Sequence, residues 1–205
     1  MGRREFNKSD KLRRIKRAAR EHFLSRDFDD ATTREIAVRA GVALGTLFTY
    51  ATDKRDLLFL AVNDELEELV GRAALAIRGD AAVVDNFVAV FGLFYRYFAQ
   101  QPNLSRLVLR EMIFYDSGAQ AKRFLAARER LIALSGEIVR RGVARGEIAA
   151  GDETDFIGWL VFGVYQAEVR RWLWTDKPNL RTGLARLRRA LVLFTNGLTS
   201  RRKRR

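Results

Sequence analysis

Residues 32–54, TTREIAVRAGVALGTLFTYATDK, constrain the fold more than any other stretch of the chain. Thr32 followed by Glu35 is a capping box, in which each side chain satisfies a free backbone amide of the other residue at a helix start. Gly41 ends this first short helix, and a second short helix is predicted over residues 43–50. Two short helices joined by a glycine-containing turn form a helix-turn-helix, whose second helix fits the major groove of DNA.

The composition favours an all-α protein. Only two of the 205 residues are proline, and long stretches repeat apolar residues at helical spacing. Cysteine is absent, which excludes disulfide bonds and thiolate chemistry. No apolar run reaches the roughly 18 residues that a membrane helix needs, so we expect a cytoplasmic protein. The formal net charge of +13 favours a polyanionic partner.

The rest of the chain is predicted to form further helices, about nine in all. The first runs from Ser9, which can cap it, to about Arg26. The fourth begins at the cap Asp53, ends near Arg78, and would extend from the DNA-binding half into the second half. Residues 81–100 are apolar on nearly all sides, which is typical of a centrally buried helix. A shorter helix is predicted to end near Tyr115, and three further helices are predicted to occupy residues 118–145, 154–174 and 180–198.

The helix-turn-helix lies in a longer pattern. Its positions are Ala19, Phe23, Phe28, Thr32, Ile36-Ala37, Ala40-Gly41-Val42, Gly45-Thr46-Leu47, Lys54 and Leu57. In these positions residues 15–58 resemble the N-terminal domain of TetR-type transcriptional regulators. The resemblance implies an N-terminal three-helix DNA-binding domain, residues 9–55, and a C-terminal helical domain for effector binding and dimerisation, residues 56–199. A basic tail follows at 200–205.

The second helix of the motif departs from the pattern of this family. Ala43 stands where the family has a Ser or Thr cap, at a cost of about 1 kcal/mol. Leu44 replaces a basic or polar residue, Phe48 a tyrosine and Ala51 a phenylalanine. These changes keep the scaffold, but no operator sequence is carried over from the family.

The motif also indicates the candidate DNA contacts. Arginines and lysines are dense between Arg3 and Arg20, immediately before the motif, and we expect them to contact phosphates. A second basic cluster, from Arg181 to Arg189, is either DNA-contacting or a solvated surface. The predicted DNA-binding residues are Thr32, Thr33, Arg34, Leu44, Gly45, Thr46, Phe48, Thr49, Tyr50 and Lys54.

Large aromatic residues in the second half suggest a ligand site. At helical spacing such rings usually form core, but the resemblance implies an effector pocket among them. An apolar cavity with a few polar groups is typical of ligand sites, so we expect a lipophilic or aromatic effector. The candidate effector-binding residues are Asn63, Phe87, Phe91, Phe94, Arg110, Glu111, Phe114, Phe124, Trp159, Phe162 and Gln166.

The last two helices carry a second strong pattern. Residues 154–174 are apolar over most of the helix circumference, and Gly158 and Gly163 permit close helix approach. The final helix repeats apolar residues at alternating spacings of four and three, a seam suited to helix packing. That seam is either intramolecular core or a partner surface, and the resemblance favours a homodimer. The predicted interface residues are Leu184, Leu187, Leu191 and Phe194.

The sequence offers little for catalysis. His22, the single histidine, stands beside Phe23 in the first helix and is interpreted as a scaffold residue. The acidic residues of 152–155 suit a helix start, where they favour the positive end of the helix dipole. Phosphate loops, metal-ligand spacings and nucleophile elbows are absent. We therefore predict that the chain is no enzyme and holds no metal or cofactor.

These observations predict a homodimeric transcriptional regulator, a repressor that a small apolar effector releases from a palindromic double-stranded DNA operator. The first alternative is a basic architectural protein that binds DNA without sequence specificity and without an effector. The second is a small-molecule-binding protein that has lost operator binding, which the departures at Leu44, Phe48 and Ala51 would permit.

Overall fold

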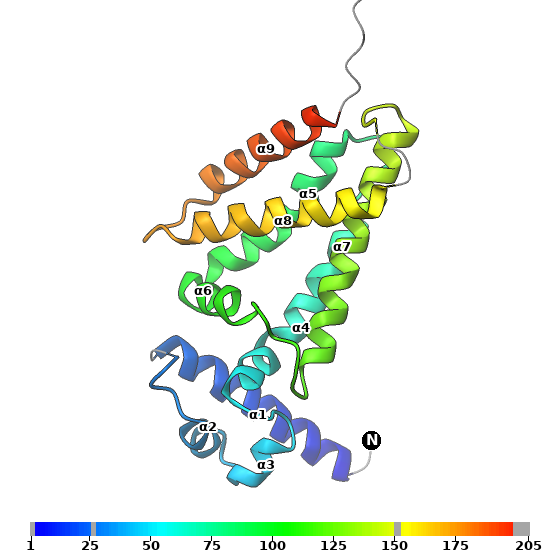
Figure 1. The fold of residues 1–205 in the computed structure, drawn as a ribbon. Coiled ribbons are helices and arrows are strands. Elements are labelled where there is room, and N and C mark those ends of the chain that lie inside the picture. Colours follow the sequence, from blue (N-terminus) through cyan, green and yellow to red (C-terminus); the bar gives the residue numbers. More distant parts are fainter. Residues whose placement is uncertain (1–2, 26–27, 150–152, 199–205) are drawn as a thin grey trace, which may run out of the picture. The chain divides into compact units, whose positions relative to one another are not determined.

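The computed structural model describes residues 3–25, 28–149 and 153–198, and within these ranges the chain forms nine α-helices and no strand (Figure 1). The predicted all-α class is confirmed for this part of the chain. The predicted basic tail, 200–205, lies outside the described residues. The helices are α1 Arg3–Ser25, α2 Thr33–Ala40, α3 Leu44–Phe48, α4 Lys54–Leu75, α5 Val83–Gln100, α6 Pro102–Glu111, α7 Ala121–Ala144, α8 Thr154–Leu173 and α9 Leu180–Gly197.

The helices divide into two compact units. Unit 1 takes the chain up to Glu67 together with Arg106–Ala126, and unit 2 takes Glu68–Ser105 together with the chain from Ala127 onward. The predicted boundary after residue 55 differs from this division. The first part of α4 and the segment joining α6 to α7 both belong with the helix-turn-helix in unit 1.

Local signals set the ends of α2. The Thr32 hydroxyl accepts a hydrogen bond from the Glu35 amide at 3.2 Å, and the Glu35 carboxylate accepts one from the Thr32 amide at 3.2 Å. The predicted capping box is thus confirmed. Gly41 ends α2 with a φ of 63°, a left-handed conformation that glycine adopts without steric cost.

Other helix ends lie within a few residues of the predicted ones, apart from the start of α1. Asp53 caps α4 as predicted, because its carboxylate accepts the Asp56 amide at 2.7 Å. Ala43 offers α3 no side-chain hydrogen bond, again as predicted. The helix α3 ends at Phe48, two residues earlier than expected, and α1 begins at Arg3 instead of Ser9.

The core of unit 1 gathers apolar side chains from helices α1 to α4 and from the 106–126 segment. Ile15, Ile36 and Leu47 have no exposed surface. The ring of Phe59 stacks on Tyr115 with 4.0 Å between centroids, and Phe124 packs at 4.7 Å from Phe59. Aromatic pairs of this kind add about 0.5–1.5 kcal/mol to their burial.

The core of unit 2 is an aromatic layer between α5 and α8, with α9 packed on both helices. Phe91 stacks on Tyr165 with 4.3 Å between centroids. At Gly158 a Cβ would lie 2.4 Å from the Gly136 backbone nitrogen, so α7 and α8 touch backbone to backbone. The close approach that Gly158 permits occurs within the chain, between α7 and α8, whereas Gly163 faces open space.

Candidate DNA-binding surface and effector-binding core

The predicted recognition helix, α3, is anchored by a single side chain. Leu47 has no exposed surface and holds α3 against the core of unit 1. The remaining side chains leave that core: Phe48 is 44 % exposed, Gly45 and Thr49 are exposed, and Leu44 is half-buried. Residues 44, 45, 48 and 49 share one face because positions four apart align on a helix.

The other predicted DNA contacts surround this face. Thr32 and Arg34 are exposed at the start of α2, and Thr33 and Thr46 are half-buried. Half-buried Tyr50 donates its hydroxyl hydrogen to the Lys8 carbonyl oxygen at 3.4 Å.

Lys54, the predicted phosphate contact, already has partners within unit 1. Its amine donates to the Asp29 carbonyl oxygen at 3.1 Å and lies 4.6 Å from the centre of the Phe28 ring. An ammonium has three donors, so this hydrogen bond leaves others for a phosphate.

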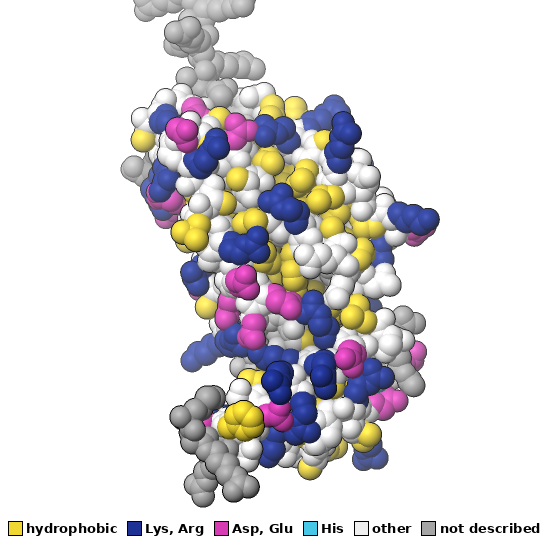
Figure 2. All heavy atoms as spheres, turned by 180° about the vertical axis from the view of Figure 1, so that it is seen from behind, with side chains coloured by type: hydrophobic (Ala, Val, Ile, Leu, Met, Phe, Trp, Pro, Cys, Tyr) yellow, Lys and Arg dark blue, Asp and Glu magenta, His cyan; other side chains and the backbone are white. Residues whose placement is uncertain are grey.

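The cations of α1 are less available than the sequence predicts. Lys16 pairs with Asp64, and Arg20 pairs with Glu65 at 2.5 Å. On the face drawn in Figure 2, Lys and Arg side chains are interspersed with Asp and Glu side chains. Among the described side chains of α1, Lys8 and Lys11 stay without an ion pair and remain candidates for phosphate contact.

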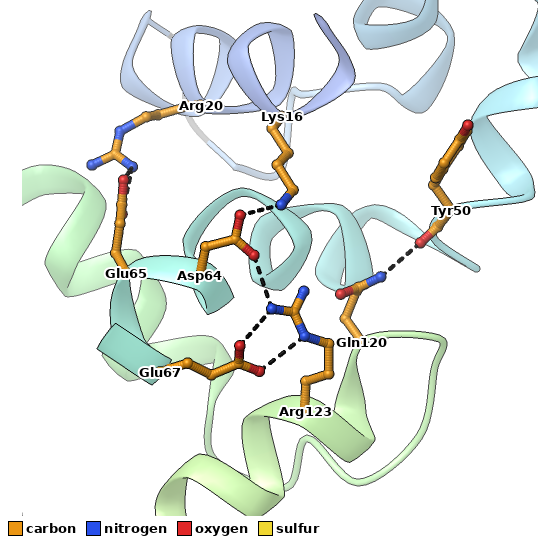
Figure 3. A network of polar contacts seen from close by, with 8 residues as sticks. All are labelled: Lys16, Arg20, Tyr50, Asp64, Glu65, Glu67, Gln120 and Arg123. Atoms are coloured by element: carbon orange, nitrogen blue, oxygen red, sulfur yellow. Dashed lines mark hydrogen bonds and ion pairs between the residues drawn. The ribbon is translucent and has the colours of Figure 1, made fainter. Parts of the chain in front are cut away.

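These ion pairs are part of a network that joins residues of α1, α4 and α7 (Figure 3). All of the residues in this network belong to unit 1. The Arg123 guanidinium reaches Asp64 at 2.8 Å and Glu67 at 2.6 Å. Burial alone raises the pKa of the Asp64 carboxyl, but hydrogen bonds from Lys16 and Arg123 outweigh burial and hold this pKa below its ordinary value. The hydrogen bond to Glu67 in turn raises the pKa of Arg123.

A buried carboxylate at the start of α4 organises the exit from α3. Asp56 has no exposed surface. Its Oδ2 accepts the backbone amides of Thr52 at 2.7 Å and Ala119 at 2.9 Å. Its Oδ1 accepts the Gln120 amide at 2.8 Å and the hydroxyl hydrogen of Tyr115. Burial raises the pKa of the Tyr115 phenol and Asp56 raises it further, so the phenol keeps its proton and donates.

The same segment also holds the backbone next to α3. The Gln120 side-chain amide donates to the Tyr50 carbonyl oxygen at 3.0 Å (Figure 3). Gly118 has a φ of 125°, and a Cβ there would lie 2.6 Å from the Asp56 carboxylate. The sequence shows Asp56 only as an acidic residue in the first turn of a helix. Its partners Tyr115, Ala119 and Gln120 are about sixty residues away in the sequence, so no local pattern predicts them.

The predicted effector residues are divided between the two units. In unit 1, the Asn63 amide donates to the Gln120 carbonyl oxygen at 3.1 Å, and Phe124 belongs to the aromatic core. Glu111 pairs with Arg55 at 3.0 Å and with Arg110 at 2.8 Å.

Phe114 is also in unit 1, where its side chain is 90 % exposed and its φ is 61°. The ring therefore stands outside the core in which a pocket wall was expected.

In unit 2 the predicted residues converge. Phe87, Phe91, Phe94 and Phe162 are buried in the aromatic layer between α5 and α8. Trp159 differs, because it is 51 % exposed and stacks on exposed Phe156 instead of entering this layer.

Two arginines that the sequence did not single out flank the aromatic layer. Arg128 lies 6.0 Å from the centre of the Phe162 ring. Arg170 donates to the Gln166 side-chain oxygen at 2.7 Å, and its buried Nε has no hydrogen-bond partner in the described structure. Burial lowers the pKa of Arg170, the charge of Arg128 lowers it further, and Tyr165 partly opposes them. Neither guanidinium has a carboxylate partner among the described residues, so the pair is suited to an anionic group of a ligand.

A surface groove of about 260 Å³ in unit 2 is lined by Ala74, Arg130, Ala133 and Leu134. None of the predicted effector residues lines this groove, and its volume is below the roughly 300–1,000 Å³ usual for small-molecule sites. We therefore do not assign the effector to it.

The predicted dimer seam faces the chain's own core. Leu187 and Leu191 have no exposed surface in the single chain, because α9 packs them on α5 and α8. A side chain without exposed surface cannot contact a second subunit, so these two residues are core. Leu184 and Phe194 are half-buried.

A different set of apolar side chains, on α8 and α9, is exposed and could contact a second subunit. Phe156 is 58 % exposed, Trp159 51 % and Leu193 65 %. Val192 is also exposed, and a Cβ at Gly163 would meet no atom within 4 Å.

The described ranges hold no group of three or more His, Cys, Asp or Glu residues arranged to bind a metal ion. Among the helices of these ranges, none is long and apolar enough to span a membrane.

A helix-turn-helix with an outward recognition helix, followed along the chain by a second helical unit, defines the class of this protein as a DNA-binding regulator. Residues 15–61 match the sequence profile of the bacterial regulatory proteins of the tetR family. Residues 15–61 are thus a TetR-type helix-turn-helix domain, and the chain is a DNA-binding transcriptional regulator.

Several known proteins resemble the chain over most of its length. The fatty acid metabolism regulator protein of Bacillus subtilis (strain 168) is 24 % identical over 170 residues, which cover 83 % of this chain and 87 % of that protein. The structure of Thermus thermophilus FadR, a TetR-family repressor in complex with lauroyl-CoA, matches with a TM-score of 0.69 and 25 % identity over 95 % of this chain and 98 % of that one. Bacillus subtilis FadR in complex with stearoyl-CoA matches with a TM-score of 0.68 and 22 % identity over 90 % and 97 %.

Proposed function

We propose that this regulator is a homodimeric repressor that binds a palindromic operator through α3 and is released by a fatty acyl-CoA thioester. Operator contacts come from the exposed face of α3, from the start of α2, and from Lys54. The two-domain scheme of the sequence is kept, with the 106–126 segment assigned to the DNA-binding unit.

The effector assignment rests chiefly on the Arg128–Arg170 pair beside the aromatic layer. An acyl-CoA combines an apolar chain with phosphate groups, and guanidinium groups are favoured partners for phosphate. Phe87, Phe91, Phe94 and Phe162 supply the apolar side of such a site. The complexes of two similar regulators with lauroyl-CoA and stearoyl-CoA support the same class of ligand.

The exposed apolar surface of α8 and α9 supports the homodimer. Phe156, Trp159 and Leu193 form a large apolar exposure on two neighbouring helices, and such patches mark interaction sites. A two-fold dimer places two recognition helices on successive major grooves when they are about 34–36 Å apart.

Operator release separates the effector proposal from its alternatives. An operator selected from random duplexes is incubated with the protein and with coenzyme A esters of increasing acyl length, free coenzyme A, or free fatty acid. We expect the long-chain esters alone to release it at micromolar concentration. Release by free fatty acid with equal potency would contradict the role of the phosphate groups, which a free fatty acid lacks.

Variants of neighbouring arginines sharpen this test. Arg170→Gln removes one guanidinium of the pair and should weaken acyl-CoA binding about tenfold or more, because charge-assisted hydrogen bonds contribute about 1.5–3 kcal/mol. Arg171 is the next residue of α8 and is exposed, so Arg171→Gln is the matched control and should bind the ligand as the wild type does. Equal loss in both variants would indicate a general charge effect.

The architectural alternative is less well supported, because it assigns no role to the arginine pair. A selected operator bound no better than random duplex would revive it. We further propose that the chain has no catalytic activity and acts in the cytoplasm, where a regulator meets its DNA.

A further inference from the structure

The recognition helix lacks the side chains that usually read bases. Residues 42–51 are VALGTLFTYA and contain no Arg, Lys, His, Asn, Gln, Asp or Glu. Bidentate contacts to guanine need Arg or Lys, those to adenine need Asn or Gln, and cytosine is read by Glu or Asp. Reading by such contacts is therefore unavailable to α3 and its flanking residues.

The hydroxyl groups near this face are partly engaged. The Thr49 hydroxyl donates to the Thr46 carbonyl oxygen at 2.7 Å, and the Tyr50 hydroxyl donates to the Lys8 carbonyl oxygen at 3.4 Å. What α3 presents outward is therefore mainly apolar, and its largest exposed group is the ring of Phe48 with Leu44 one turn before it.

Gly45 lies on the same face and has no structural requirement for glycine. A Cβ there would meet no atom within 4 Å, and its φ is not positive. Glycine inside a helix costs about 0.5–1 kcal/mol relative to alanine, so the fold itself gains nothing from it. Without a side chain at this position, the helix backbone can approach a ligand closely. Here the ligand is the DNA, and the approach is to the floor of its major groove.

We infer that this protein reads its operator through the 5-methyl groups of thymine, which contact Leu44 and Phe48 beside the bare backbone of Gly45. The thymine methyl is the apolar group that base pairs present in the major groove, and apolar side chains contact it there. Arg34 at the start of α2 contacts phosphate instead, because the first helix of a helix-turn-helix crosses the backbone. This inference rests on the proposed operator binding and names the chemistry of the sequence that is read.

Deoxyuridine tests this directly, because it differs from thymidine only by the missing methyl. The operator is first selected from random duplexes, and each thymidine of one half-site is then replaced in turn. At each contacted position we expect the dissociation constant to rise about fourfold, the ratio that corresponds to losing one buried methyl-sized group.

Two variants locate the contact. Phe48→Ala should abolish the thymidine-to-deoxyuridine ratio at its own position and leave the ratio at other positions. Arg34→Ala is the control, because it should weaken binding to both duplexes equally and keep every ratio. A ratio that survives in Phe48→Ala and in Leu44→Ala would overturn the assignment to these side chains.

Gly45→Ala gives an independent readout. The variant should fold as stably as the wild type or better, since the site is open, yet bind the selected operator at least tenfold more weakly. Unchanged operator affinity would refute the close approach.

The inference and the proposed function fail in different ways. A specific operator with no penalty at any deoxyuridine means that the sequence is read without contacts to thymine methyl groups, and the inference alone is wrong. If no sequence is enriched over random duplex, operator binding itself fails and the inference fails with it.

Discussion

Replacing Asp56 with asparagine tests how unit 1 is held together. The Oδ1 atom of Asp56 accepts Tyr115 and Gln120, and Oδ2 accepts Thr52 and Ala119. An asparagine keeps one acceptor oxygen and places a donor at the other position, so the Thr52 and Ala119 amides lose their acceptor in one orientation, and the Gln120 amide loses its acceptor in the other, where the Tyr115 hydroxyl must accept instead of donate. Hydrogen bonds to a charged group contribute about 1.5–3 kcal/mol each, which gives a loss of about 1.5–6 kcal/mol.

This loss is large beside the roughly 5–15 kcal/mol by which domains are stable. Urea unfolding followed by far-ultraviolet circular dichroism should show an earlier transition for Asp56→Asn. Asp116→Asn is the matched control, because Asp116 is exposed in the same segment and should leave the transition unchanged. Gly118→Ala should reproduce the defect, since its Cβ would displace the Asp56 carboxylate. A free energy of unfolding for Asp56→Asn within about 1 kcal/mol of wild type would refute the reasoning.

Three further predictions concern DNA, assembly and pH. Lys54→Ala should reduce the log–log salt dependence of operator binding by about 0.9, and an unchanged slope would exclude its phosphate contact. Leu193→Glu should give folded monomers in sedimentation, whereas Leu187→Glu should unfold the subunit, because only the first residue is exposed; a dimeric Leu193→Glu would place the interface elsewhere. The lowered pKa of Asp64 means that its contribution to stability is present above pH 3.8 and is lost as the pH falls below it. Asp64→Asn should therefore flatten acid unfolding between about pH 4 and 2, by less than about 1 kcal/mol since the carboxylate is largely exposed.

The sequence by itself determined the features that depend on neighbours within a turn. The capping box of Thr32 and Glu35, the left-handed Gly41 and the cap Asp53 were all predictable, because each interaction joins residues at most a few positions apart. The spacing between them is specific to a helix-turn-helix, so the fold class followed.

Helical periodicity left the partner of each apolar face open. The spacing of Leu184, Leu187 and Leu191 shows that one face of α9 is covered. The same spacing is expected whether that face packs on a second subunit or on the chain's own core. The structure places Leu187 and Leu191 against α5 and α8 and leaves Leu193 outward.

The polar sites were decided by tertiary structure alone. Asp56 meets Ala119 and Gln120, and Arg170 comes near Arg128, across more than forty residues of chain in each case. The sequence around a charged residue does not show which distant residue pairs with it or buries it, or whether it stays available for a ligand. Only the packing of the helices brings such groups together, because burial and the distance between charges are properties of the folded chain.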